Sequence, residues 1–177
     1  CAGLLQVIRQ IKQVTIMSSY DYSKTVVKPT LLLKGKACFA QVHDVTLIVS
    51  DIPKWSNELV LEYLNGMIKI GGGVSVPASA AIFLGDSFDA GQRKLSADWI
   101  AENGFEPAKR ITMISDSLLI RGSLTAYSWL TKTEAKAFAM KDHAAMCDWI
   151  ARGRIAKAED IHAALLASFQ LLGKKLP

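Results

Sequence analysis

The chain has 177 residues, of which 50% are hydrophobic, and it carries a net charge of +5 from 21 basic and 16 acidic residues. This length suits one domain with an appendage, and the hydrophobic fraction is sufficient for a sizeable core. The basic residues form no run and do not alternate with aromatic residues, which speaks against nucleic-acid binding. No stretch approaches the roughly 20 apolar residues that are needed to span a bilayer.

The three cysteines, Cys1, Cys38 and Cys147, have spacings that match no metal-binding or CxxC pattern. An odd number of widely spaced cysteines indicates reduced thiols, as in the cytoplasm, and Cys38 and Cys147 lie in apolar segments that predict core positions. The sequence leaves two alternatives open for the role of Cys1. It could be the lipidated residue of a bacterial, membrane-anchored lipoprotein, or the nucleophile of an N-terminal hydrolase.

The first part of the chain alternates between helical and strand-like patterns. Residues 3–14 predict an amphipathic helix, and residues 15–30 predict a loop or a weak edge strand. Two apolar runs, 36–42 and 45–50, predict the strands of a hairpin with a tight turn at 43–44. The second run is almost wholly apolar and β-branched, which is typical of a strand buried on both faces.

Strict alternation of helices and strands follows. Ser56 precedes a helical pattern and can cap that helix, which the glycines at 71–73 end. Residues 78–84 predict a buried strand, and residues 89–103 predict a second helix. The remaining elements are a strand, a helix, a strand and two helices, at 110–115, 117–132, 135–140, 143–153 and 158–172.

This order predicts an α/β fold: a mostly parallel, mixed sheet of about five strands flanked by helices. The α/β domain is expected to cover residues 36–153. An N-terminal helix and extended arm (1–35) precede it, and a C-terminal helical extension (154–177) follows. The amphipathic helices at both ends must pack on the sheet or on a partner, which includes a second copy of the chain.

Three stretches carry the strand and helix order most clearly: VTLIVSDIPKWSNELVLEYLNGM, AAIFLGDSFDAGQRKLSADWI and ITMISDSLLIRGSLTAYSWLTKTEAKAFAMKDHAAMCDWIA. In pattern and order they resemble the STAS domain, the fold of bacterial anti-sigma-factor antagonists and of the cytoplasmic tails of sulfate transporters. The resemblance covers about residues 36–153. It implies a non-enzymatic regulatory module that binds another protein, such as a kinase.

In the antagonists, the loop before the second helix carries an Asp-Ser-(Ser/Thr)-Gly motif with a phosphorylated serine. Here the matching positions are Asp86, Ser87, Phe88 and Asp89, so Asp-Ser is kept while a large apolar residue and an acid replace the rest. The resemblance implies that Ser87 accepts a phosphate, although Asp89 would repel it. The divergent STAS-like group related to lipid transfer lacks this signature. From the residues alone, Asp86, Ser87 or Asp89 only caps the helix.

Two loops that follow strands should meet at the carboxyl edge of the sheet, where open α/β sheets bind ligands. Their polar residues are the predicted partner-binding or anion-binding residues: Asp86, Ser87, Asp89, Ser115, Asp116 and Ser117. Trp55 lies beside a proline and a lysine and is expected to be an exposed contact residue.

The three histidines, His43, His143 and His162, are far apart in the sequence, so no metal site and no cofactor are predicted. The leading interpretation is a cytoplasmic protein-binding module without catalytic residues, bound to membrane only if Cys1 is lipidated. A module that binds a lipid or another apolar ligand between helices and sheet is one alternative. A small serine or cysteine hydrolase, using Cys1 or a triad of Ser87, His143 and Asp116, is the other.

Overall fold

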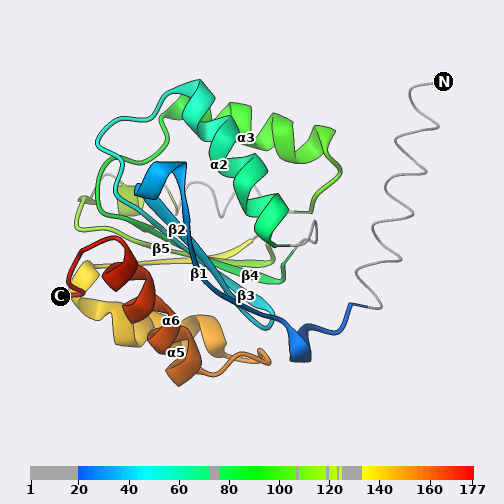
Figure 1. Cartoon of the computed structure of the whole chain (residues 1–177), viewed down its shortest axis with the longest axis vertical. Coiled ribbons are helices and arrows are strands. Elements are labelled where there is room, and N and C mark those ends of the chain that lie inside the picture. The colour runs from blue at the N-terminus through cyan, green and yellow to red at the C-terminus, as the bar shows by residue number, and fades with distance from the viewer. Residues whose placement is uncertain (1–19, 72–75, 107, 119, 123, 125–132) are drawn as a thin grey trace.

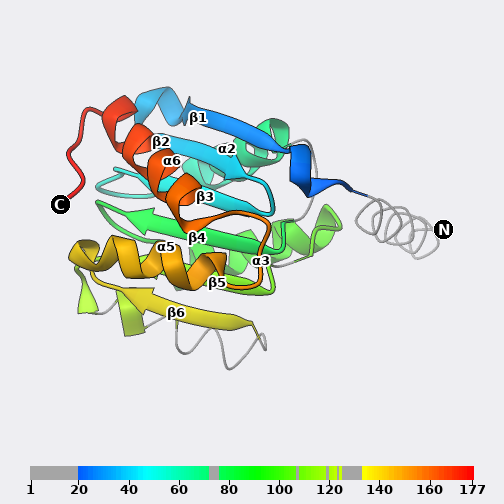
Figure 2. The ribbon, with the colours of Figure 1, turned by 90° about the horizontal axis from the view of Figure 1, so that it is seen from below.

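A single sheet organises the chain. The computed structural model describes residues 20–71, 76–106, 108–118, 120–122, 124 and 133–177. The six strands lie side by side in chain order: β1 (Val26–Leu32), β2 (Ala37–Val42), β3 (Val45–Ser50), β4 (Ala78–Phe83), β5 (Arg110–Ile114) and β6 (Glu134–Phe138). Neighbours from β1 to β3 are antiparallel, and those from β3 to β6 are parallel (Figure 2). The predicted α/β class and mostly parallel sheet are confirmed.

The first strand overlaps the segment 15–30, for which the sequence predicted a loop or a weak edge strand. β1 pairs with β2 around a bulge between Val27 and Thr30. Pro29 lies in this irregular part. Proline has no N–H to donate, and an edge strand tolerates it because one side of the strand has no neighbour to pair with. The sheet therefore has six strands rather than about five, and it begins before residue 36, where the α/β domain was expected to start.

The hairpin between β2 and β3 is confirmed, with His43 at a positive φ of 52° in its turn. Every residue of β3 is buried, as expected for a strand covered on both faces. Asp44 in the turn is also buried. Its Oδ1 accepts hydrogen bonds from the N–H groups of Ile155 (3.0 Å) and Ala156 (3.1 Å), so this carboxylate ties the hairpin to the loop before the last helix.

The helices lie in two layers. They are α2 (Asn57–Ile70), α3 (Ala90–Glu102), α5 (His143–Ala151) and α6 (Ala158–Leu171), with 3-10 turns at η1 (Tyr22–Lys24), η2 (Leu33–Gly35) and η3 (Met140–Asp142). Helices α2 and α3 cover one face of the sheet, and α5 and α6 cover the other (Figures 1 and 2). Right-handed crossovers that advance in one direction place the connecting helices on one face. Ile120, in the helical part of the β5–β6 connection, accordingly packs in the same core as α2.

Several predicted features lie outside the described residues: the helix at 3–14, Cys1, the glycines at 72–73 and the end of the 117–132 helix from residue 125 onward. The predicted cap of α2 is confirmed, since the Ser56 hydroxyl accepts the N–H of Leu59 at 3.3 Å. Among the described residues, no helix has both the length and the apolar character that crossing a membrane requires.

The C-terminal helix shares the core of the sheet. Helix α6 packs on β1, β2 and β3. Its residues Ile161, Leu165 and Phe169 are at most 2% exposed and belong to one cluster with Leu47 and Val49 of β3 and with side chains of α5. The extension expected at 154–177 therefore packs on the sheet itself.

Cys38 and Cys147 are free and buried, at 0% and 2% exposure, as predicted for core cysteines. Burial, with a smaller contribution from the charge of Asp148, raises the pKa of the Cys147 thiol from 9.0 to about 12. Because the folded chain then holds this proton more tightly than the unfolded chain, the contribution to stability is complete below pH 9.0 and is lost as the pH rises through about 12.

We therefore expect the free energy of unfolding to fall as the pH rises from 9.0 towards about 12. The fall should be less steep in a Cys147→Ala variant, which lacks the titrating thiol. Denaturant titrations at successive pH values measure both slopes, and equal slopes for the two proteins would contradict the assignment.

Candidate functional site

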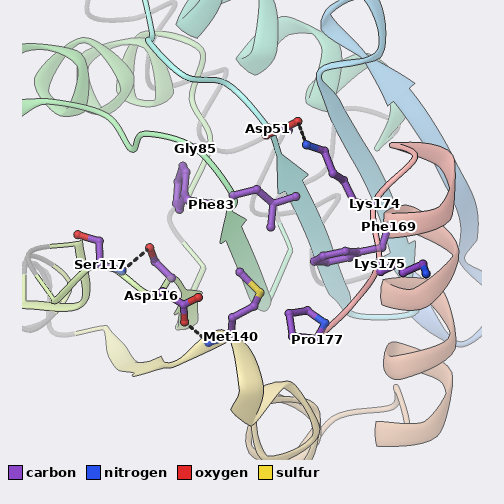
Figure 3. Close-up of a pocket in the computed structure, with 12 residues that line it drawn as sticks. Asp51, Phe83, Gly85, Asp116, Ser117, Met140, Phe169, Lys174, Lys175 and Pro177 are labelled. Carbon is purple, nitrogen blue, oxygen red and sulfur yellow. Dashed lines mark hydrogen bonds and ion pairs between the residues drawn. The ribbon is translucent and has the colours of Figure 1, made fainter.

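The ends of all four parallel strands meet at one edge of the sheet. Asp51 follows β3, residues 84–89 follow β4, residues 115–117 follow β5, and Met140 comes shortly after β6. The two loops predicted from the sequence thus lie at the same edge, as expected. Residues 174–177, which follow α6, return to this edge as well (Figure 3).

The loop after β4 is anchored by direct backbone contact with the loop after β3. A Cβ atom on Gly85 would lie 2.3 Å from the carbonyl oxygen of Ile52, so only glycine fits there. The N–H of Asp86 donates to that same carbonyl at 2.9 Å. The close approach of the two loops fixes the position of Ser87, the next residue along the chain.

Trp55 reinforces the same contact, and the expectation that it is exposed is wrong. The side chain is only 5% exposed, and its Nε1–H donates to the carbonyl of Asp86 at 2.9 Å. Its ring packs edge-on against Phe88 and Tyr63, with centroids 4.6 and 5.4 Å apart. Burial removes the large apolar surface of the ring from water, and the hydrogen bond to Asp86 satisfies the indole N–H.

Asp89 caps α3, whereas Ser87 does not. Asp89 Oδ1 accepts the N–H of Gln92 at 2.8 Å, and the Gln92 side chain accepts the N–H of Asp89 at 3.0 Å, which completes a capping box. Gln92 also donates to the carbonyl of Trp55 at 2.9 Å. Ser87 is half-buried and forms no hydrogen bond within the described part of the chain, so its hydroxyl is free to interact with a ligand or an enzyme.

The loop after β5 is organised by its three polar residues. Ser117 Oγ accepts the N–H of Ile120 at 3.4 Å, and Ser115 Oγ accepts the N–H of Ser117 at 3.2 Å. Asp116 Oδ1 accepts the N–H of Met140 at 3.0 Å, which links this loop to the start of η3. Both hydroxyls thus act as acceptors towards the backbone and keep their own protons for another partner.

Two pockets border these loops, and Ser117 lines both. The first, which we call the loop groove, has a volume of about 580 Å³ and lies between residues 86–89 and residues 117, 118, 120 and 122. The second, the tail pocket, has a volume of about 410 Å³ and lies between the strand ends and residues 174–177 (Figure 3). The six predicted polar loop residues all line one or both of these pockets.

The sequence did not indicate several residues of these pockets. Leu118 is 78% exposed beside the loop groove. Asp51 and Lys174 form an ion pair of 2.7 Å at the tail pocket. Asp51 could have been found from its position directly after a strand, but no sequence pattern places Lys174 beside it.

The histidines are arranged differently from what their spacing suggested. His143 and His162 stack with ring centroids 5.1 Å apart, and their facing nitrogens are 3.2 Å apart. The other ring nitrogen of His143 contacts the carbonyl oxygen of Pro177 at 2.9 Å. Both nitrogens of His143 therefore have partners other than Ser87 and Asp116, and the triad drawn from the sequence is not assembled.

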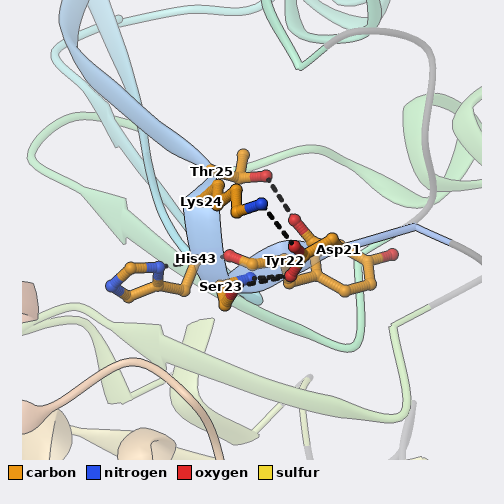
Figure 4. Close-up of polar contacts among 6 residues, drawn as sticks. All are labelled: Asp21, Tyr22, Ser23, Lys24, Thr25 and His43. Carbon is orange, nitrogen blue, oxygen red and sulfur yellow. Dashed lines mark hydrogen bonds and ion pairs between the residues drawn. The ribbon is translucent and has the colours of Figure 1, made fainter.

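His43 lies at the opposite, amino edge of the parallel strands. Its ring Nδ1 is 3.1 Å from the carbonyl oxygen of Tyr22, and its backbone N–H donates to the carbonyl oxygen of Thr25 at 2.7 Å. His43 therefore holds η1 against the hairpin (Figure 4). Across the described ranges, no three His, Cys, Asp or Glu side chains gather in a way that could hold a metal ion.

Neither a protein-family model, nor a curated protein, nor a solved structure matches this chain at a significant level.

Proposed function

We propose that this chain is a STAS-like binding module that acts without catalysis and contacts another protein through the loop groove. The observation that carries the proposal is the combination of an apolar groove with a nearly fully exposed leucine at its side. Leu118 is 78% exposed, and Phe88 and Ile120 line the groove next to it. An apolar centre with a polar rim is the usual composition of a protein–protein contact surface.

The rim of the groove carries charge of both signs. Asp86 and Asp89 are exposed carboxylates, and Arg93 Nη1 donates to the carbonyl of Phe88 at 2.6 Å. Charged side chains around an apolar centre contribute to the choice of partner and to the association rate more than to affinity. We expect the partner to insert an apolar side chain beside Leu118 and to place polar groups against this rim.

Ser87 would be the point of regulation in such a module, with a kinase as a second partner. Its unpaired hydroxyl belongs to a residue that lines the loop groove together with Asp86 and Asp89. A phosphate would add about two negative charges beside Asp86 and Asp89. Repulsion within the loop would then weaken binding of the partner, so a Ser87→Glu variant should bind less of it than a Ser87→Ala variant.

A photo-crosslinking residue at position 118 tests the proposal. We expect p-benzoylphenylalanine in place of Leu118 to attach one defined protein in the cells that produce the chain. The same residue in place of Leu166, which is 39% exposed on α6, should not attach it. Addition of a Leu118→Asp variant should not compete for the crosslink, whereas the unmodified chain should.

Two results would overturn the proposal. One is a set of crosslinked proteins that is the same at positions 118 and 166, and the other is no crosslink at 118. If the attached protein is a second copy of the chain, the groove is a homodimer interface, and the proposed binding to a different protein is wrong.

A further inference from the structure

The tail pocket lies on the other side of the 115–117 turn from the loop groove, and its lining is of a different kind. Its apolar lining includes Phe83, Met140 and Phe169, each at most 9% exposed. These side chains belong to the cores on both faces of the sheet, so they are held rigidly. They offer a preformed apolar surface to the side chain of a small ligand.

The two sides of the pocket carry opposite net charges. Asp116 and Ser117 lie on one side, and Asp51, Lys174 and Lys175 lie on the other, where the two lysines outweigh the one carboxylate (Figure 3). Asp116 uses Oδ1 for the N–H of Met140, and its second oxygen has no partner among the described residues. The Lys174 ammonium has three N–H donors, of which the 2.7 Å ion pair with Asp51 needs one.

The hydroxyl of Ser115 adds a buried donor. Ser115 is only 3% exposed, lines the tail pocket and accepts the N–H of Ser117 through Oγ. Because Oγ acts only as an acceptor in that bond, the hydroxyl proton of Ser115 can be donated to a ligand, and so can the hydroxyl proton of Ser117. The pocket thus has hydrogen-bond donors for an anionic group and a free carboxylate oxygen for a cationic group.

The wall made by residues 174–177 is built into the end of α6. Gly173 has a φ of 67°, and the N–H of Lys174 donates to the carbonyl of Phe169 at 2.9 Å, as in a Schellman motif. The ion pair with Asp51 and the contact of Pro177 with His143 then hold the segment at the sheet edge. The wall is therefore in place before a ligand arrives.

From these features we infer that the tail pocket binds a small zwitterion with an apolar side chain, namely a free apolar amino acid. Asp116 would accept from the α-ammonium group. Lys174 and the hydroxyl of Ser115 would donate to the carboxylate, and Phe83, Met140 and Phe169 would contact the side chain. A volume of about 410 Å³ is within the range of known small-molecule sites. This inference is independent of the proposed function of the loop groove.

Calorimetric titration of the full chain with L-leucine, L-methionine and L-phenylalanine tests the inference. At least one of them should bind below about 10 mM, with backbone amide NMR shifts at Gly85 and Ser115. The N-acetyl derivative lacks the ammonium group, the amide lacks the carboxylate, and glycine lacks the side chain. Each should bind at least about tenfold more weakly, because a charged hydrogen-bonding group or the apolar contact is lost.

Variants locate the site. Asp116→Asn keeps an oxygen for the N–H of Met140 and should still fold, but it should weaken binding about tenfold because the negative charge is lost. Asp148→Asn, at an exposed position of α5, is the matched control and should bind as the unmodified chain does. The inference is overturned if no amino acid binds, if the blocked derivatives bind equally well, or if both variants behave alike.

Discussion

Replacing Gly85 by alanine is expected to destabilise the protein by about 3 kcal/mol or more, one of the largest effects of a single methyl group in this chain. The added Cβ would lie 2.3 Å from the carbonyl oxygen and 2.6 Å from the carbonyl carbon of Ile52, and both are backbone atoms. Neither can move as the end of a flexible side chain would. The loop after β4 must therefore shift, and the hydrogen bond from the N–H of Asp86 to Ile52 breaks.

Gly122 provides the control for this substitution. It lies in the helical part of the β5–β6 connection, and a Cβ there would meet nothing within 4 Å. Gly122→Ala should therefore be neutral or stabilise the protein by up to about 1 kcal/mol, because alanine favours a helix. Chemical denaturation of both variants measures the difference. A Gly85→Ala protein as stable as the unmodified chain would show that the two loops are not in backbone contact.

Phe169→Ala should cost about 3–5 kcal/mol, the usual range for removing a buried aromatic ring. Phe169 is 2% exposed, is among the largest fully buried side chains, and joins α6 to the core beneath β1, β2 and β3. The same substitution enlarges the tail pocket and should loosen the segment that follows α6.

Leu166 lies on the same helix at 39% exposure, so Leu166→Ala should change stability by less than about 1 kcal/mol. Thermal and denaturant unfolding of both variants measures the two effects. If the Phe169→Ala variant unfolds like the Leu166→Ala variant, α6 does not share the core of the sheet in solution.

The β2–β3 hairpin and the parallel part of the fold could be predicted because their sequence patterns are local. The almost wholly apolar run of β3, the tight turn at 43–44 and the regular alternation of helices and strands each follow from spacing that the chain itself displays. The proximity of the loops after β4 and β5 could also be predicted from the sequence, since parallel strands bring their carboxyl ends to one edge of the sheet. These features need no knowledge of contacts between distant residues.

The remaining features depend on such contacts. Pro29 made β1 look unlike a strand, and only its place at the sheet edge makes the residue tolerable. Trp55 stands between polar residues in the sequence, yet its burial is determined by Asp86 and Phe88, which lie more than thirty positions away. The pair of His143 and His162 and the approach of Lys174 to Asp51 likewise arise only when α6 packs beside α5.

The sequential order of the strands divides the carboxyl edge into two parts with separate origins. The described helical parts of the connections between the parallel strands lie on the face of α2 and α3, so the loop groove is made by segments that the sheet topology itself requires. The tail pocket is closed by Lys174, Lys175 and Pro177, which take part in no strand or crossover. Substitutions in that short segment would therefore reshape the tail pocket while the sheet and its crossovers stay unaltered.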